Sequence, residues 1–135
     1  MTSGPTTVLA FDFGLRSIGV AIGQAITRTA SEVSTLRARD GVPDWRSVDA
    51  LVHEWRPDVL LVGLPLNMDD SISDMAKRAK RFADRLGARY RLKVELVDER
   101  LTSFEARGLS RDVDRQHAIA ARLIAESYLG NVSGI

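Results

Sequence analysis

The sequence predicts an α/β domain in which helices flank a mixed five-stranded sheet. Three observations lead to this prediction. Two apolar, strand-like runs lie near the N-terminus, and a weaker run rich in Thr, Ser and Val follows them. Amphipathic helical segments then alternate with short apolar runs to the end of the chain. A meander of strands followed by alternating helices and strands is typical of a mixed sheet with helices packed on it.

The first two strands are expected at residues 8–13 and 17–23. The segment between them is too short for a crossover, so the strands should pair as an antiparallel hairpin. A weaker third strand is expected at 29–36. The run VLLV at 59–62 has the uninterrupted apolar character of a central strand that is covered on both faces. A fifth strand is expected at 92–97.

Three helices are expected around these strands. The segment PDWRSVDALVHEWRP has an apolar face at helical spacing, with Asp44 as N-cap and Pro57 as stop. A second helix is expected from about residue 73 to 86, ended by Gly87, and a third from about 114 to 129, ended by Gly130. The resulting order of elements matches the ribonuclease H-like fold, a likeness of topology that gives no function by itself.

Composition narrows the classes of function. The 135 residues suffice for a compact core, and we expect a single domain over residues 1–135. A net charge of +1 means that any basic surface must be local. The absence of cysteine excludes disulfides and thiolate metal sites. No secretory signal and no bilayer-length apolar run are present, so we expect a cytoplasmic protein without a membrane partner.

Asp12 is the first candidate site residue, because it lies within the apolar run VLAFDFGLRSIGVAIG. A carboxylate in a buried strand is costly unless a partner compensates it. Asp12 could cap the turn or pair with Arg16, or it could bind a metal ion or a phosphate group. We expect Gly14, Gly19 and Gly23 to leave open space beside it for a phosphate and a cation.

Two further groups could join Asp12. Strand ends converge at one edge in this topology, so Glu99, after the fifth strand, could reach an ion held by Asp12. The same segment could be a charged strand end that caps a short helix, a role that can coexist with catalysis. Asp114 and His117 share one face of the last helix, with His117 at the border between core and water. His117 could be a ligand, an acid or base, or a histidine hydrogen-bonded to backbone.

These residue types point to phosphodiester chemistry. Hard cations such as Mg²⁺ and Mn²⁺ require several oxygen ligands, and Asp12, Glu99 and Asp114 are the candidates. Cations held in this way can activate water and stabilise the leaving oxygen of a phosphodiester. The sequence therefore favours a metal-dependent nuclease in which Asp12, Glu99, Asp114 and His117 are the candidate catalytic residues.

The second predicted helix is the candidate nucleic-acid surface. It carries Lys77, Arg78, Lys80, Arg81 and Arg85, with Arg89 and Arg91 near its end. Such charges could form an ordinary solvated face or contact phosphates, and Lys77, Arg78 and Arg81 are the principal candidates for phosphate contacts. Phosphate contacts would position a nucleic acid without reading its sequence. Trp45 and Trp55 lie on an apolar helical face and are interpreted as core residues.

Four blocks in this order, FDFGLRSIGVAIG, VGLPLNMDDS, DERLTSFEA and AARLIAESYL, resemble the YqgF/RuvX family. Its members are Holliday junction resolvase-like proteins that are also described as pre-ribosomal-RNA nucleases. The resemblance spans residues 8 to about 129. It implies a ribonuclease H-like fold, a cytoplasmic nuclease dependent on Mg²⁺ or Mn²⁺, and processing of the 5′ end of pre-16S rRNA in ribosome biogenesis, with pre-ribosomal particles as partners.

The resemblance also assigns residues. Asp12 corresponds to the family's first-strand aspartate and Glu99 to the glutamate of its DER motif. Residues of the shared motifs that would line a substrate groove are Arg16, Asn67, Arg100 and Thr102. The family usually has an aspartate where this chain has His117. Either the imidazole replaces that carboxylate, with Asp114 one turn away supplying charge, or the site is weakened and the protein binds RNA without cutting it.

Three other functions compete with this one. A DNA junction resolvase would need two active sites for two symmetric cuts, hence a dimer, and the sequence leaves monomer and homodimer open. A non-cleaving ribosome-assembly factor would be consistent with the loss of the aspartate at 117. An ATPase of the actin and sugar-kinase group shares the Asp-x-Gly hairpin, but it clamps its nucleotide between two such domains, and this chain has the length of one.

Overall fold

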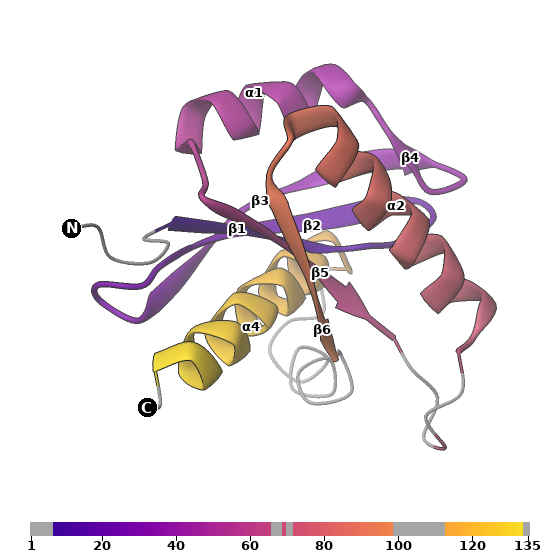
Figure 1. Ribbon diagram of the computed structural model, residues 1–135. Coiled ribbons are helices and arrows are strands. Elements are labelled where there is room, and N and C mark those ends of the chain that lie inside the picture. Colours follow the sequence, from indigo (N-terminus) through magenta and orange to yellow (C-terminus); the bar gives the residue numbers. More distant parts are fainter. Residues whose placement is uncertain (1–6, 66–68, 70–71, 99–112, 134–135) are drawn as a thin grey trace.

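The computed structural model describes residues 7–65, 69, 72–98 and 113–133. Its elements, in chain order, are β1 (Thr7–Asp12), β2 (Ser17–Gln24), β3 (Thr29–Arg39), β4 (Val42–Pro43), α1 (Trp45–Trp55), β5 (Val59–Leu64), α2 (Asp74–Tyr90), β6 (Lys93–Asp98) and α4 (Val113–Ser133). They form one mixed sheet in which α1 and α2 cover one face and α4 covers the other (Figure 1). The predicted α/β architecture is confirmed.

The sheet has the order β4-β3-β2-β1-β5-β6. Strands β1 to β4 pair antiparallel with one another in turn, whereas β5 pairs parallel with both β1 and β6. The expected hairpin of the first two strands is therefore present. The expected count of five strands is wrong, because the two-residue strand β4 pairs with the end of β3. Two residues are too few to produce a periodic signal in the sequence.

The central strands separate two cores. Along β1, Leu9 and Phe11 belong to the core under α1 and α2, whereas Val8 and Ala10 belong to the core under α4. This alternation follows from the two-residue period of a strand. The run at 59–62 is buried throughout and lies in β5, directly beside β1, which confirms it as a central strand.

The N-terminal ends of the helices agree with the expectations, whereas the C-terminal ends expected at glycines do not. Asp44 and Ser73 cap α1 and α2 by accepting from the backbone N–H groups of Arg46 and Ala76. Gly87 does not end α2, and Gly130 does not end α4. The C-cap of α2 is instead Arg91, and that of α1 is Arg56. Both caps adopt the left-handed conformation, which is common at the C-terminal ends of helices and is usually adopted there by glycine.

A charged clamp joins α1 to α2. Asp49 accepts two 2.8 Å hydrogen bonds from the Arg89 guanidinium and one of 2.6 Å from the Tyr90 hydroxyl. Arg89 also lies 5.3 Å over the Trp45 ring, and that ring stacks on Phe82. The hydrogen bonds from Arg89 and Tyr90 lower the pKa of Asp49 to about 2. Both tryptophans pack against the core, as expected.

No helix in the described part of the chain is both long and apolar enough to cross a membrane.

Candidate active site

The carboxyl ends of the parallel strands meet at one edge of the sheet. Strand β1 ends at Asp12 and β6 at Asp98, and the register places Phe11 beside Val62 and Leu64 beside Asp98. With strands ~4.8 Å apart, β6 lies roughly 10 Å from β1. The backbone therefore brings the end of the fifth predicted strand to the edge that carries Asp12, as the topology predicted. Glu99, the next residue, lies outside the described residues.

Asp12 is the one buried charged side chain among the residues that the structure describes, with 6% of its surface exposed. It is paired with Gly19 across the β1–β2 hairpin, on the α4 face of the sheet. Its Oδ2 lies 3.0 Å from Nδ1 of His117, whose side chain is 28% exposed. Two candidates that are 105 residues apart in the sequence thus form a direct contact.

The geometry of this contact fixes one proton. An ionised carboxylate can only accept hydrogen bonds, so Nδ1 of His117 is the donor when Asp12 is charged. The other ring nitrogen, Nε2, is then the atom of this ring that can accept a proton or bind an ion. The partly exposed position of His117 at the border of the core is as predicted, and the next residues on its helical face, Ala121 and Ile124, are fully buried.

The glycines beside Asp12 do not leave open space, contrary to expectation. A Cβ on Gly19 would overlap the carbonyl of His117 and lie 2.7 Å from the backbone nitrogen of Ala118. A Cβ on Gly23 would lie 2.8 Å from Val8 and 3.1 Å from Leu129. Helix α4 fills this space. The glycines instead let the helix backbone approach the sheet closely enough for His117 to contact Asp12.

Ion pairs that the sequence reasoning missed hold α4 in this position. Arg122 Nη1 donates to Glu32 Oε2 on β3 at 2.8 Å, and Arg115 Nε lies 3.8 Å from the other oxygen of Glu32. Further along the helix, the Tyr128 hydroxyl donates to Glu95 on β6 at 3.0 Å. These bonds link α4 to strands on both sides of β1. Glu32 lies in the weakest predicted strand, and nothing in the local pattern marks it as a partner of the last helix.

The remaining predicted ligands are not placed. Asp114 lies in the first turn of α4, but its side chain is outside the described part, as are Asn67, Glu99, Arg100 and Thr102. Among the described side chains, no group of three His, Cys, Asp or Glu residues could hold a metal ion. Arg16 is exposed in the turn between β1 and β2, where its carbonyl accepts from Ala38 N–H.

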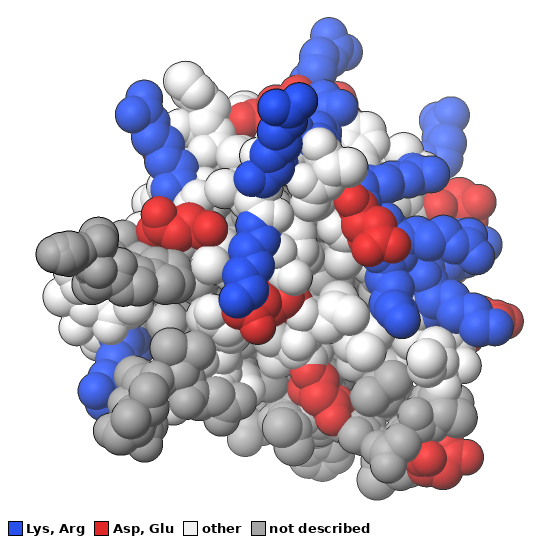
Figure 2. All heavy atoms as spheres, in the orientation of Figure 1, with Lys and Arg blue, Asp and Glu red and all other residues white. Residues whose placement is uncertain are grey.

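The predicted basic helix is α2, and its cations gather on one side of the molecule (Figure 2). Lys77 and Arg81 are exposed, and Arg78 lies 3.1 Å from Asp40. Arg89 belongs to the clamp with Asp49 and is therefore a structural residue. The first turns of the helix supply a basic surface near the edge that carries Asp12, since its N-cap, Ser73, donates to the carbonyl of Pro65, the residue after β5.

Comparisons with known proteins show which family this chain belongs to. A family model described as "RuvX: Holliday junction resolvase" matches residues 6–131. A protein of Azotobacter vinelandii named "Putative pre-16S rRNA nuclease" is 53% identical over 94% of this chain and 95% of its own length. One of Marinobacter nauticus with the same name is 49% identical over 97% of both chains.

Solved structures show the fold. RuvC of Thermus thermophilus in complex with a Holliday junction substrate has a TM-score of 0.56 at 13% identity, covering 96% of both chains. The Fowlpox virus resolvase in complex with Holliday junction DNA has a TM-score of 0.53 at 13% identity, covering 95% of this chain and 99% of its own. The predicted ribonuclease H-like fold is confirmed.

Proposed function

The chain belongs to the RuvX family, and on that premise we propose that it is a divalent-metal-dependent nuclease that cuts structured RNA, with the 5′ end of the pre-16S rRNA as its substrate. The observation that carries this proposal is the buried Asp12 at the edge of the parallel strands, in contact with His117. The names of the curated relatives support the choice of RNA. We take residues 1–135 as one catalytic domain acting in the cytoplasm.

The donor chemistry at this edge fits a divalent cation. Asp12 offers carboxylate oxygens, and the backbone brings the position before Glu99 to the same edge. Glu99 and Asp114 would complete the oxygen ligands with Asp12. When bound, Mg²⁺ or Mn²⁺ would supply activation of a water and stabilisation of the leaving oxygen.

The chain's own residues orient the reaction. Asp12 accepts the Nδ1 proton of His117 and so holds the ring with Nε2 directed away from the pair. In this state Nε2 can take a proton from a water or nucleophile and return it to the leaving oxygen. Close packing of α4 on Gly19 fixes the ring relative to the carboxylate. His117 therefore acts as the acid and base where the family usually has a carboxylate.

Two other functions are kept as outcomes of the test. The family description and the junction complexes of similar fold favour a DNA junction resolvase as the second candidate. Such a resolvase would act as a homodimer, because it makes two symmetric cuts. A non-cleaving RNA-binding factor is the third.

A cleavage assay on labelled RNA tests the proposal. The substrate spans the 5′ end of the small-subunit precursor, with Mn²⁺, Mg²⁺ or chelator. We expect metal-dependent cuts that Asp12→Asn abolishes and that Glu54→Gln, an exposed change on α1, leaves unchanged. Cleavage of junction DNA but not RNA would favour the resolvase. Binding of RNA without cleavage by the wild type, equal in Asp12→Asn, would contradict catalysis at Asp12.

A further inference from the structure

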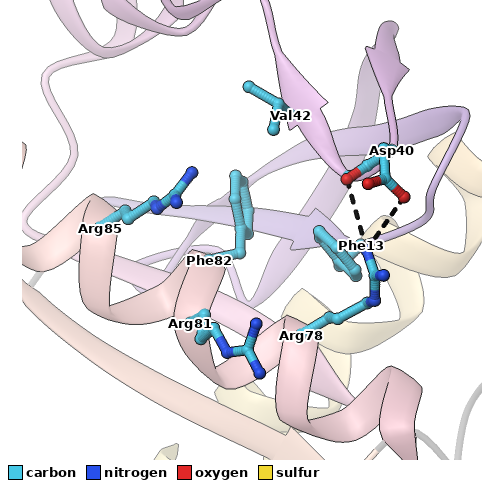
Figure 3. A pocket seen from close by; sticks show the side chains of 8 residues that line it. Phe13, Asp40, Val42, Arg78, Arg81, Phe82 and Arg85 are labelled. Carbon is cyan, nitrogen blue, oxygen red and sulfur yellow. Dashed lines mark hydrogen bonds and ion pairs between the residues drawn. The ribbon is translucent and has the colours of Figure 1, made fainter.

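A pocket of about 260 Å³ lies between α2 and the turn that joins β3 to β4 (Figure 3). Three arginines line it, all from α2, together with two phenylalanines and the residues of the turn. The lining residues are Phe13, Asp40, Gly41, Val42, Arg78, Arg81, Phe82 and Arg85. Neither Asp12 nor His117 contributes to it.

Helix periodicity builds the cationic wall. Arg78, Arg81, Phe82 and Arg85 are spaced three, four and seven residues apart, so they share one face of α2. Phe82 is 3% exposed and packs 5.4 Å from the Phe13 ring, which anchors this face on the core. Figure 3 shows Arg85 and Arg78 on either side of the Phe82 and Phe13 rings, with Arg81 on the turn of α2 between them.

The opposite wall is equally fixed. Gly41 has a φ of +82°, and a Cβ there would lie 2.8 Å from the Phe13 ring, so the turn rests directly on that ring. The Gly41 N–H also donates to the Leu15 carbonyl at 2.9 Å, which joins the two turns of the sheet. A pocket between rigid walls binds its ligand with little ordering of the protein.

The charge of the pocket selects an anion. Arg78 is engaged by Asp40, whose Oδ1 is 3.1 Å away, and Asp40 is the one acidic residue of the lining. Arg81 and Arg85 make no ion pair with any residue in the described ranges. Two guanidinium groups beside an apolar base suit the oxygens of a phosphate, which they can bind in bidentate geometry. The rings of Phe13 and Phe82 are too buried to serve as stacking platforms for a base.

The position of the pocket relative to Asp12 indicates which molecule carries the phosphate. Phe13 follows Asp12 directly, and their side chains lie on opposite sides of the sheet, so the pocket and the Asp12–His117 pair flank the same edge. We propose that the pocket binds a phosphate of a single-stranded segment of the substrate RNA that leaves the cleavage site across this edge. The inference rests on the proposed nuclease function for the identity of the ligand.

Binding of single-stranded RNA in chelator tests the pocket separately from cleavage. Arg81→Gln/Arg85→Gln is compared with Arg56→Gln/Lys93→Gln, which removes two exposed charges at the opposite edge, where β5 and β6 begin. We expect the pocket variant to weaken binding roughly ten- to a hundredfold and to reduce the log–log salt slope by about 0.7, the value for one lost phosphate contact on a single strand. Equal binding by the pocket and control variants would overturn the proposal.

Two further arms identify the source of the phosphate and separate the two proposals. A loss with both 5′-hydroxyl and 5′-phosphorylated RNA assigns an internal phosphate, and a loss confined to the latter assigns a terminal one. Arg81→Lys/Arg85→Lys, which keeps charge without the planar fork, should recover part of the affinity. If the wild type cuts no RNA but the pocket variant binds RNA more weakly than the wild type, the nuclease proposal fails and the pocket proposal holds. If the wild type cuts RNA but the pocket and control variants bind it equally, the pocket proposal fails and the nuclease proposal holds.

Discussion

The two faces of the sheet are built from opposite kinds of residue. On the α4 face, glycine and alanine let a helix backbone approach the strands, and a buried carboxylate contacts a histidine there. On the α1–α2 face, Phe11, Phe13 and Phe82 form an aromatic core, and a cationic pocket lies at its rim. Small residues thus place a helix accurately at the proposed reaction site, whereas large ones hold helices apart and leave room for a ligand.

Truncation of the aromatic core should have the largest effect on stability. Phe82 contacts both Phe11 and Phe13 and is almost fully buried. Phe82→Ala should reduce the free energy of unfolding by about 3–5 kcal/mol, through lost burial and the remaining cavity. Urea denaturation measures it. A loss below 1 kcal/mol would show that the aromatic face is not the main core.

Enlarging a glycine on the other face should cost less stability but more activity. In Gly19→Ala the new methyl group would overlap the backbone of α4 at His117. We expect a loss of about 1–3 kcal/mol from overpacking, with displacement of His117 from Asp12. Urea unfolding and cleavage rate together measure this.

Gly130→Ala is the matched control for that change. A Cβ at Gly130 meets nothing within 4 Å, and the residue lies within α4. Alanine there should stabilise the protein by about 0.5–1 kcal/mol through helix propensity, with cleavage unchanged. If both substitutions proved neutral, close packing of α4 would not be what positions His117.

Loss of the partly buried ion pair under α4 should have a smaller effect. In Glu32→Gln the pair with Arg122 loses its charge while the shape of the side chain is kept. We expect a loss of about 1 kcal/mol in the free energy of unfolding, smaller in high salt. An unchanged midpoint of urea unfolding at low salt would show that Glu32 does not hold the helix.

The smallest effect is expected at the exposed clamp between α1 and α2, and it should depend on pH. Because Arg89 and Tyr90 lower the pKa of Asp49 from 3.8 to about 2, the folded state binds the proton of Asp49 less tightly than the unfolded state. The stabilisation is present above pH 4 and lost as the pH falls toward 2. Asp49→Asn should therefore melt below the wild type at pH 7, and the gap should close by about pH 2. A gap independent of pH would contradict this.

The order of elements was readable from the sequence because each strand and helix carries its own periodicity. Gly87 and Gly130 were misread as stops, since packing against the sheet carries a helix through a glycine that intrinsic propensity would disfavour. Strand β4 was missed because its pairing with β3 exists only in the folded chain.

In the candidate site, too, single residues could be identified from the sequence, but their contacts could not. Asp12 was identifiable because a charge in an apolar strand is unusual, and His117 because it lies at the start of the last apolar helix face. Their contact spans 105 residues and depends on how closely α4 packs, so no local pattern in the sequence predicts it. The charges of α2 were visible too, but only the turn at Asp40 and Gly41 determines that Arg81 and Arg85 line a pocket.

The most direct test of the account is the single-turnover cleavage rate of His117 variants on the precursor RNA. We predict that His117→Ala loses about 10²–10⁴-fold in rate with RNA affinity unchanged, and that His117→Asp, whose carboxylate can also take up and return a proton, keeps measurable activity. A His117→Ala protein that cuts as fast as the wild type would contradict a catalytic role for the Asp12–His117 pair. An inactive wild type combined with a His117→Asp variant that cuts the RNA would also contradict it, because the histidine would then mark a weakened site.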